Sequence, residues 1–384
     1  MEIADKSDML VKVQKCDVPV FKKNQPDDTN KYLPAPSPTG TFPYRLALET
    51  IQPVVSDEKM VFHVLGDTGS MRNPDFIKYV VGEMVKQYEP AQSEEEVPQF
   101  LFHLGDIVYN HGEAEQYKRQ FFEPYKHYPA PIFAIAGNHD SDVNPDNQRR
   151  YKSLDAFKAV FCDTTSRTVS FSGNADRKSM TQPNIYWTLE TPLANIIGMH
   201  SNVPKFGVVM PEQRSWLVNE LKNADKQRPN KAVILCIHHS PYSADINHGS
   251  SVPMIELLEG VFKETGIKPD IVLSGHVHNY QRFVKSYPDG HKVPFVVAGA
   301  GGYDELHSIA RTDDKQFTTV NPLFEGVHLQ NFCDDQHGFL KITLEKDNDA
   351  LTLIGEYFTI PQTNRHQKEY LPSSVLADRF VIQI

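Results

Sequence analysis

The sequence predicts an α/β protein built on an open sheet, and three observations support this prediction. Six short apolar runs recur between residues 60 and 298, and most of them are typical of buried strands. Polar stretches with turn-spaced apolar residues lie between several of the runs, and most runs are followed by a loop that contains glycine. Such alternation favours right-handed crossovers, with reactive loops at the carboxyl ends of the strands.

The expected elements follow in chain order. Strands are expected at residues 60–65, 100–104, 132–136, 232–237, 271–273 and 294–298, and helices near residues 74–88, 114–125, 211–224 and 252–265. Two further strands are expected at Ile185–Leu189 and Asn195–Met199. The end of the chain is predicted to be a hairpin, in which Gly338–Leu344 and Leu351–Ile354 flank an Asp/Asn turn at 347–349.

These elements predict one large domain with additions at both ends. Residues 1–58 are polar and broken by prolines, which is typical of an extended N-terminal arm. The main domain is expected at residues 59–360, with its longest insertion at about 141–184. Residues 361–384 are expected to form a C-terminal extension.

The composition limits the classes of function. Thirty-nine basic and forty-nine acidic residues give a formal charge of −10, which would repel a phosphate backbone, so nucleic acid is not an expected partner. No apolar run reaches the ~18 residues of a membrane span, and the N-terminus lacks the apolar core of an export signal. We expect no membrane partner, and a cytoplasmic chain as written, or a secreted or periplasmic one if a signal was removed. The four cysteines form no CxxC pair, which leaves room for one disulfide.

Five of the apolar runs end in clusters of metal-ligand residue types. The clusters are Gly66-Asp67-Thr68-Gly69, Gly105-Asp106-Ile107-Val108-Tyr109, Gly137-Asn138-His139-Asp140, His238-His239-Ser240-Pro241-Tyr242 and Gly275-His276-Val277-His278. Because the carboxyl ends of parallel strands meet at one edge of a sheet, these clusters can converge on one point. Carboxylates, amide oxygens and imidazoles suit divalent or trivalent first-row metals. Two such ions can clamp a phosphoryl oxygen and activate a water, so the pattern predicts a dinuclear site.

At these residues the chain resembles the metallophosphoesterase (calcineurin-like) superfamily and, within it, purple acid phosphatases of the short, single-domain mammalian-like type. The ordered family pattern DxG, GDxxY, GNH(D/E), xxxH and GHxH is met by the five clusters in turn. The resemblance covers roughly residues 60 to 302. It implies a four-layer α/β/β/α sandwich, in which two mixed β-sheets lie face to face and helices flank them.

The resemblance also implies the metal ligands. The first ion would be held by Asp67, Asp106, Tyr109 and His278, and the second by the bridging Asp106 together with Asn138, His239 and His276. Most of the superfamily has histidine where this chain has Gly69, whereas purple acid phosphatases have glycine there and supply a tyrosinate, at the position of Tyr109. A phenolate favours iron(III) and gives a charge-transfer colour. The implied cofactors are therefore Fe(III) and a divalent Fe, Zn or Mn.

Three further residues are implied to act on the substrate. His139 would face the phosphate, and Asp140 can orient it. His248 resembles a further substrate-facing histidine of the family and is the candidate acid for the leaving alcohol. The implied reaction is hydrolysis of a phosphomonoester, on a small molecule or a phosphoprotein, by a metal-bound hydroxide and without a phosphoenzyme intermediate. The rivals are a phosphodiesterase on the same scaffold and a non-catalytic metal-binding scaffold.

Other histidines admit structural interpretations. Adjacent strand residues point to opposite faces, so one of His238 and His239 should reach the metals, and the Ser-Pro-Tyr that follows His239 favours His239. His63 and His103 lie inside expected strands and are predicted to pack rather than to bind metal.

Overall fold

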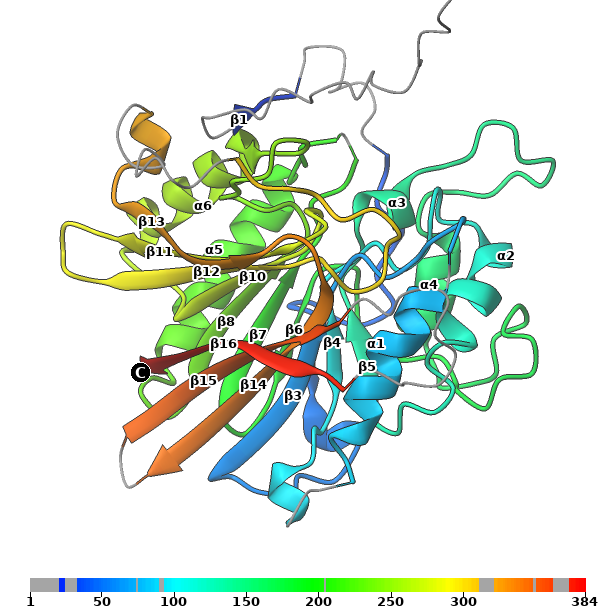
Figure 1. Cartoon of the computed structure of the whole chain (residues 1–384), viewed down its shortest axis with the longest axis horizontal. Helices are drawn as coiled ribbons and strands as arrows, with labels where there is room; N and C mark the ends of the chain where they lie inside the picture. The colour runs from blue at the N-terminus through cyan, green and yellow to red at the C-terminus, as the bar shows by residue number, and fades with distance from the viewer. Residues whose placement is uncertain are drawn as a thin grey trace, which may run out of the picture.

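The computed structural model describes residues 21–24, 33–73, 75–89, 93–203, 205–310, 321–347, 350–361 and 373–384. Two mixed sheets dominate this part of the chain (Figure 1). In spatial order, the eight-stranded sheet contains β13 (Val327–Cys333), β11 (Tyr280–Ser286), β12 (Lys292–Ala298), β10 (Ile271–Ser274), β8 (Ala232–Ile237), β7 (Ala194–Met199), β6 (Trp187–Glu190) and β2 (Arg45–Ala47). The six-stranded sheet contains β16 (Val375–Gln383), β15 (Ala350–Ile360), β14 (His337–Asp347), β3 (Lys59–Leu65), β4 (Leu101–His103) and β5 (Ile132–Ala134). A short parallel pair joins β1 (Phe21–Lys22) to β9 (Ser250–Ser251).

Helices and short helical turns connect the strands. The α-helices are α1 (Asp75–Lys86), α2 (Ala114–Tyr117), α3 (Asn138–Ser141), α4 (Asp155–Phe161), α5 (Pro211–Asp225) and α6 (Val252–Thr265). The 3-10 turns are η2 (Leu48–Thr50), η3 (Glu94–Glu96) and η6 (Pro322–Phe324), and the π-helical turn is η4 (Lys118–Phe122). Local chemistry fixes these bounds: Ser251 caps α6 by accepting from the Met254 N–H, and Gly266 ends it at φ 70°.

Successive side chains of a strand point to opposite faces of its sheet, so the apolar side chains form three clusters, one between the sheets and one outside each sheet. Phe62 and Val64 of β3 face the space between the sheets, where they join a cluster that includes Trp187 of the opposite sheet. A second cluster packs α1 and α4 against the outer face of the six-stranded sheet, and a third packs α5 and α6 against the eight-stranded sheet. Figure 1 shows these helices beside their sheets. The four-layer α/β/β/α sandwich is therefore confirmed.

Parallel pairing places the functional loops together. β3, β4 and β5 are parallel neighbours, and so are β7, β8, β10 and β12. The loops that follow strands of one such set leave at the same edge of the sheet. Both sheets contribute to the predicted site, through the loops after β3, β4 and β5 and those after β8 and β10.

The ends of the chain contribute strands to both sheets. Arg45–Ala47, within the predicted arm, forms the edge strand β2 beside β6, and Val375–Gln383, within the predicted extension, pairs with β15. The terminal hairpin forms with longer strands than expected, and its turn residues 348–349 lie outside the described residues. Residues 1–20, 25–32 and 362–372 also lie outside them. The division of the chain at residues 58 and 360 stays a prediction.

Two sequence expectations concern cysteines and membranes. Cys162, Cys236 and Cys333 are free thiols, and Cys16 lies outside the described residues. No helix in the described ranges has both the length and the apolar character that a membrane span requires.

Candidate metal centre

Hydrogen bonds between loop backbones join the two sheets at the predicted site. The Asp67 N–H donates to the Gly105 carbonyl at 2.9 Å, and the Gly275 N–H donates to the His238 carbonyl at 3.0 Å. The His276 N–H crosses between the sheets to the Asp67 carboxylate at 2.8 Å. With the His139 N–H, which donates to Asp106 Oδ1 at 2.9 Å, these bonds connect all five predicted clusters.

Three predicted ligands have left-handed backbone conformations. The φ angles are 58° at Asp67, 54° at Asp106 and 67° at His276. A non-glycine residue in this region costs about 1–3 kcal/mol and persists only where the surrounding structure enforces it. Such strain concentrates at functional sites because it aims side chains that relaxed strands would direct elsewhere. Here the three residues with this backbone conformation lie in adjoining loops, and the Asp67 carboxylate accepts from the His276 N–H.

The first group of predicted ligands surrounds the Tyr109 phenol. Its oxygen lies 2.9 Å from Asp106 Oδ2, 3.3 Å from Asp67 Oδ1 and 3.2 Å from His278 Nε2. Tyr109 is fully buried, and burial raises the pKa of its phenol well above the ordinary value, with Asp106 and Asp67 adding to the effect. A phenolate at this position needs a strong compensating positive charge.

The second group surrounds the Asn138 amide oxygen. His276 Nδ1 lies 2.9 Å from this oxygen, and His238 Nε2 lies 3.1 Å from it. The ring of His239 lies 4.4 Å from that of His276, measured between ring centroids. His238 Nε2 is also 3.4 Å from Asp106 Oδ2, which connects this group to the first.

The donor set fits metal ions. Asp106, His238 and His276 each offer a ligand atom, and these atoms lie within 4.8 Å of one another. Within the described part of the chain, Nε2 of His239 and Nε2 of His276 are buried without a hydrogen-bond partner. Buried polar atoms of this kind cost free energy unless something satisfies them. Converging carboxylate, amide and imidazole donors provide the chemistry that first-row cations require.

Buried charges perturb one another strongly. Burial raises the pKa of Asp67 well above its ordinary value, and the charge on Asp106 acts in the same direction. Burial also opposes the ionisation of Asp106 and is the largest single effect, but His238 and His139 together outweigh it and hold the pKa of Asp106 below its ordinary value. Burial lowers the pKa of His238, yet Asp106 reverses the shift and raises it to about 9.

Asp140 connects two loops of the site. Its carboxylate accepts from the backbone N–H groups of Ile107 at 3.0 Å, Val108 at 3.1 Å and Gly137 at 2.9 Å. Burial, with Asp106 second, raises its pKa to about 6. These bonds fix the Asp106 loop against the Asn138 loop. These contacts of Asp140 are to backbone N–H groups and not to the His139 ring, which Asp140 was expected to orient.

His139 and His248 lie on either side of the predicted ligands. The ring of His139 lies 4.3 Å from that of Tyr109 between centroids, and its Nδ1 is 2.6 Å from the Asn110 carbonyl oxygen. The ring of His248 lies 4.3 Å from that of His276. Burial, with His307 second, lowers the pKa of His248 to about 3.

Three neighbours of the site escaped the sequence analysis. Tyr303 lies 4.3 Å from His278 between ring centroids, and His307 stacks on His278 at 4.3 Å. Ser201 Oγ lies 2.7 Å from His239 Nδ1. Tyr303 follows the end of β12 at the same edge of the sheet, so its position had a signal in the sequence. His307 and Ser201 match no motif.

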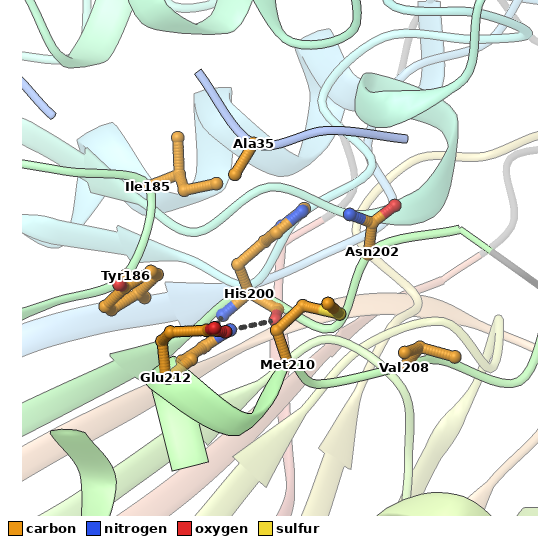
Figure 2. A pocket seen from close by; sticks show the side chains of 9 residues that line it. Ala35, Ile185, Tyr186, His200, Asn202, Val208, Met210 and Glu212 are labelled. Atoms are coloured by element: carbon orange, nitrogen blue, oxygen red, sulfur yellow. Dashed lines mark hydrogen bonds between the residues drawn. The ribbon is translucent and has the colours of Figure 1, made fainter. Parts of the chain in front are cut away.

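His200 borders a separate cavity of about 130 Å³, which Figure 2 shows together with Ala35, Tyr186 and Asn202. Its backbone N–H donates to Gln213 Oε1 at 2.8 Å. Its ring is buried, and neither ring nitrogen bonds another group in the described ranges. His200 therefore faces this cavity and is not one of the predicted metal ligands, although it is adjacent to Ser201 in the chain.

His63 and His103 pack inside their strands, as predicted. His63 Nδ1 lies 3.0 Å from the Tyr128 hydroxyl and Nε2 lies 3.1 Å from Gln87 Oε1. His103 Nε2 lies 2.9 Å from Thr68 Oγ1. Both side chains are fully buried.

Comparison with known proteins supplies a family match and distant relatives. Residues 60–280 match the calcineurin-like phosphoesterase family. Purple acid phosphatase 15 of Arabidopsis thaliana is 26% identical over 217 residues, which cover 53% of this chain and 36% of that protein. A probable glycerophosphodiester phosphodiesterase of Arcobacter nitrofigilis is 28% identical over 153 residues, 39% of this chain and 45% of that protein. The chain thus spans less than half the length of these two relatives.

A solved structure is similar in fold. GAP50, described as the anchor in the inner membrane complex of Plasmodium, gives a TM-score of 0.50 at 14% sequence identity. The match covers 84% of this chain and 90% of that chain. At this identity the likeness concerns the fold alone.

Proposed function

The chain belongs to the calcineurin-like phosphoesterase family, and on that premise we propose that it is a dinuclear metal-dependent phosphatase. Its substrates would be phosphomonoesters, as for an acid phosphatase, and its centre would be of the purple acid phosphatase type. The relatives include purple acid phosphatase 15 of Arabidopsis thaliana.

The observation that carries the proposal is the contact of the Tyr109 phenol with three predicted ligands, Asp67, Asp106 and His278. Gly69 stands where most of the superfamily has a histidine, and a Cβ there would lie 2.9 Å from the Val108 Cα. No larger residue fits there without movement, and in the proposed centre the phenol oxygen of Tyr109 would take the place of a histidine nitrogen. Burial raises the pKa of this phenol, so its ionisation would need a strongly charged cation close by, and Fe(III) would supply that charge.

The remaining assignments divide the donors between two ions. Asp67, Asp106, Tyr109 and His278 would hold the first ion, and Asp106, Asn138, His239 and His276 would hold the second. When bound, two such ions supply Lewis acidity toward a phosphoryl oxygen and a water. The divalent partner would be Fe, Zn or Mn.

The other residues act on the substrate side. We assign His139 to the phosphate, because its ring lies against Tyr109 and its backbone N–H bonds Asp106 at 2.9 Å. Asp140 would support this position indirectly, by holding the two loops together. His248 is the candidate acid for the leaving alcohol. Its pKa of about 3 leaves the ring neutral at ordinary pH, so the role requires the negative charge of a bound phosphate to raise that pKa.

Phosphodiester hydrolysis is the second candidate, favoured by the similarity to a probable glycerophosphodiester phosphodiesterase. Metal pairs act on either ester, and the rim of the site selects between them. Turnover of p-nitrophenyl phosphate and of its bis ester by the metal-loaded full chain tests the proposal. We expect a kcat/KM at least about tenfold higher for the monoester, a difference of about 1.4 kcal/mol in the barrier. Preference for the bis ester would make the second candidate correct.

A further inference from the structure

We propose that His238 is an additional ligand of the second metal ion. This assignment rests on the proposed dinuclear centre and extends it, because the family pattern uses a single histidine here, His239. The proposal reverses the expectation that His238 points away from the metals.

The position of His238 follows from the end of β8. The strand ends at Ile237, so the rule that adjacent strand residues face opposite sides no longer governs residues 238 and 239. The rings of His238 and His239 both lie near His276, at centroid distances of 5.2 and 4.4 Å. Both side chains are fully buried.

Glycines make room for the His238 ring. A Cβ on Gly105 would lie 2.8 Å from His238 Nδ1, and one on Gly275 would lie 3.4 Å from the same atom. The first distance is shorter than real Cβ contacts allow. The two glycines therefore leave the space that this imidazole occupies.

The hydrogen bonds of the ring fix which nitrogen faces the ligands. Nδ1 lies 2.8 Å from the Leu104 carbonyl oxygen, which can only accept, so Nδ1 carries a proton. Nε2 lies 3.1 Å from Asn138 Oδ1 and 3.4 Å from Asp106 Oδ2, two further acceptors. In the absence of a cation, a proton on Nε2 satisfies these two oxygens, in keeping with the raised pKa of His238. A metal ion would replace that proton and be held by Nε2 together with the two oxygens.

The same pattern is typical of metal-bound histidines. Such residues donate their other ring N–H to a carbonyl or carboxylate, which fixes the tautomer and the ring orientation. His238 has this partner in Leu104, and the distances to Asn138 and Asp106 link it to donors already assigned to the second ion. The rival role is a proton on Nε2 that hydrogen-bonds Asp106 and leaves the ion to the other donors.

Zinc titration of chelator-treated full chains separates the two roles. The variants are His238→Gln and His239→Gln, and the control is His200→Gln, which removes a buried histidine outside the donor set. We expect two zinc ions per wild-type chain and at least about tenfold weaker binding of one of them in both His238→Gln and His239→Gln. The control should stay within about twofold of the wild type.

The outcomes distinguish this assignment from the proposed function. Two unchanged affinities in His238→Gln beside a weakened one in His239→Gln would overturn the assignment and leave the dinuclear centre intact. A wild-type chain that binds no zinc, iron or manganese would refute both. If His238→Gln does not fold, an anomalous difference map of zinc-loaded wild-type crystals decides, since a ligand nitrogen lies about 2.0–2.1 Å from zinc. An ion more than about 3 Å from His238 Nε2 would contradict the proposal.

Discussion

Replacing Ser201 by alanine should weaken one metal site without unfolding the protein. Ser201 Oγ lies 2.7 Å from His239 Nδ1, and both groups are fully buried. If Nε2 of His239 faces the second ion, Nδ1 carries the proton and donates it to Ser201. The variant leaves that buried N–H without an acceptor and frees the ring to rotate.

The size of the effect follows from this single bond. A buried donor that loses its partner costs about 1–3 kcal/mol, and each 1.4 kcal/mol corresponds to about a tenfold change in affinity. The predicted loss is therefore roughly 5- to 140-fold in the affinity for one ion, which overlaps the ~10- to 100-fold typical of groups that orient metal-bound histidines. The other ion, bound to Tyr109, should keep its affinity within about twofold.

The assay is zinc titration of the chelator-treated full chain, with thermal unfolding measured in parallel. Ser172→Ala is the matched control, because Ser172 Oγ is also buried but bonds nothing in the described ranges. The control should bind both ions normally. Normal binding of both ions by Ser201→Ala would refute the role assigned to His239.

Four further changes test the remaining assignments. Asp106→Asn should lose both ions and at least about 100-fold in kcat, because one carboxylate serves both sites; metal analysis and turnover measure this. Tyr109→Phe should abolish the broad visible band of the iron-loaded protein. His248→Ala should slow alkyl phosphates by about 100-fold and aryl phosphates only a few-fold, since good leaving groups need no proton. His63→Gln should flatten the acid side of the stability profile, measured by urea unfolding between pH 7 and pH 4.5.

The sign of the His63 effect follows from its burial. Burial lowers the pKa of His63 from 6.5 to about 4. Below pH 6.5 the unfolded chain therefore takes up a proton that the folded chain cannot. The stability is fully present above pH 6.5 and falls as the pH decreases toward 4, by roughly 3 kcal/mol for this residue.

Each of these four predictions has a contrary result. If Asp106→Asn keeps its turnover, Asp106 does not bridge the two ions. If the iron-loaded wild type is active but colourless, Tyr109 does not bind iron as a tyrosinate. Equal slowing of alkyl and aryl phosphates would count against His248 as the acid. An unchanged pH profile in His63→Gln would mean that other buried groups govern acid unfolding.

Local rules predicted the alternating strands and helices and the meeting of the five loops, whereas the four-layer sandwich was implied by the family resemblance. Short apolar runs such as 60–65, which is buried along its whole length, can be recognised one at a time, and parallel strands bring their carboxyl ends to one edge of a sheet. The contact of Asp67 with His276, 209 residues apart, also requires the two sheets to pack face to face, because these residues follow strands of different sheets.

Other features depend on exact loop geometry or on distant pairing. The direction of His238 could not be predicted because the strand rule ends one residue earlier, at Ile237. The support of His239 by Ser201 joins residues 38 apart in loops that carry no motif. The pairing of Val375–Gln383 with β15 has no local signal either, since it depends on where the chain returns.

Anomalous diffraction from crystals of the metal-loaded full chain tests the central claim most directly. Two ions a few ångströms apart should lie among the side chains grouped around Tyr109 and Asn138, with Asp106 in contact with both. A single ion, or ions bound elsewhere while these side chains stay unliganded, would contradict the account.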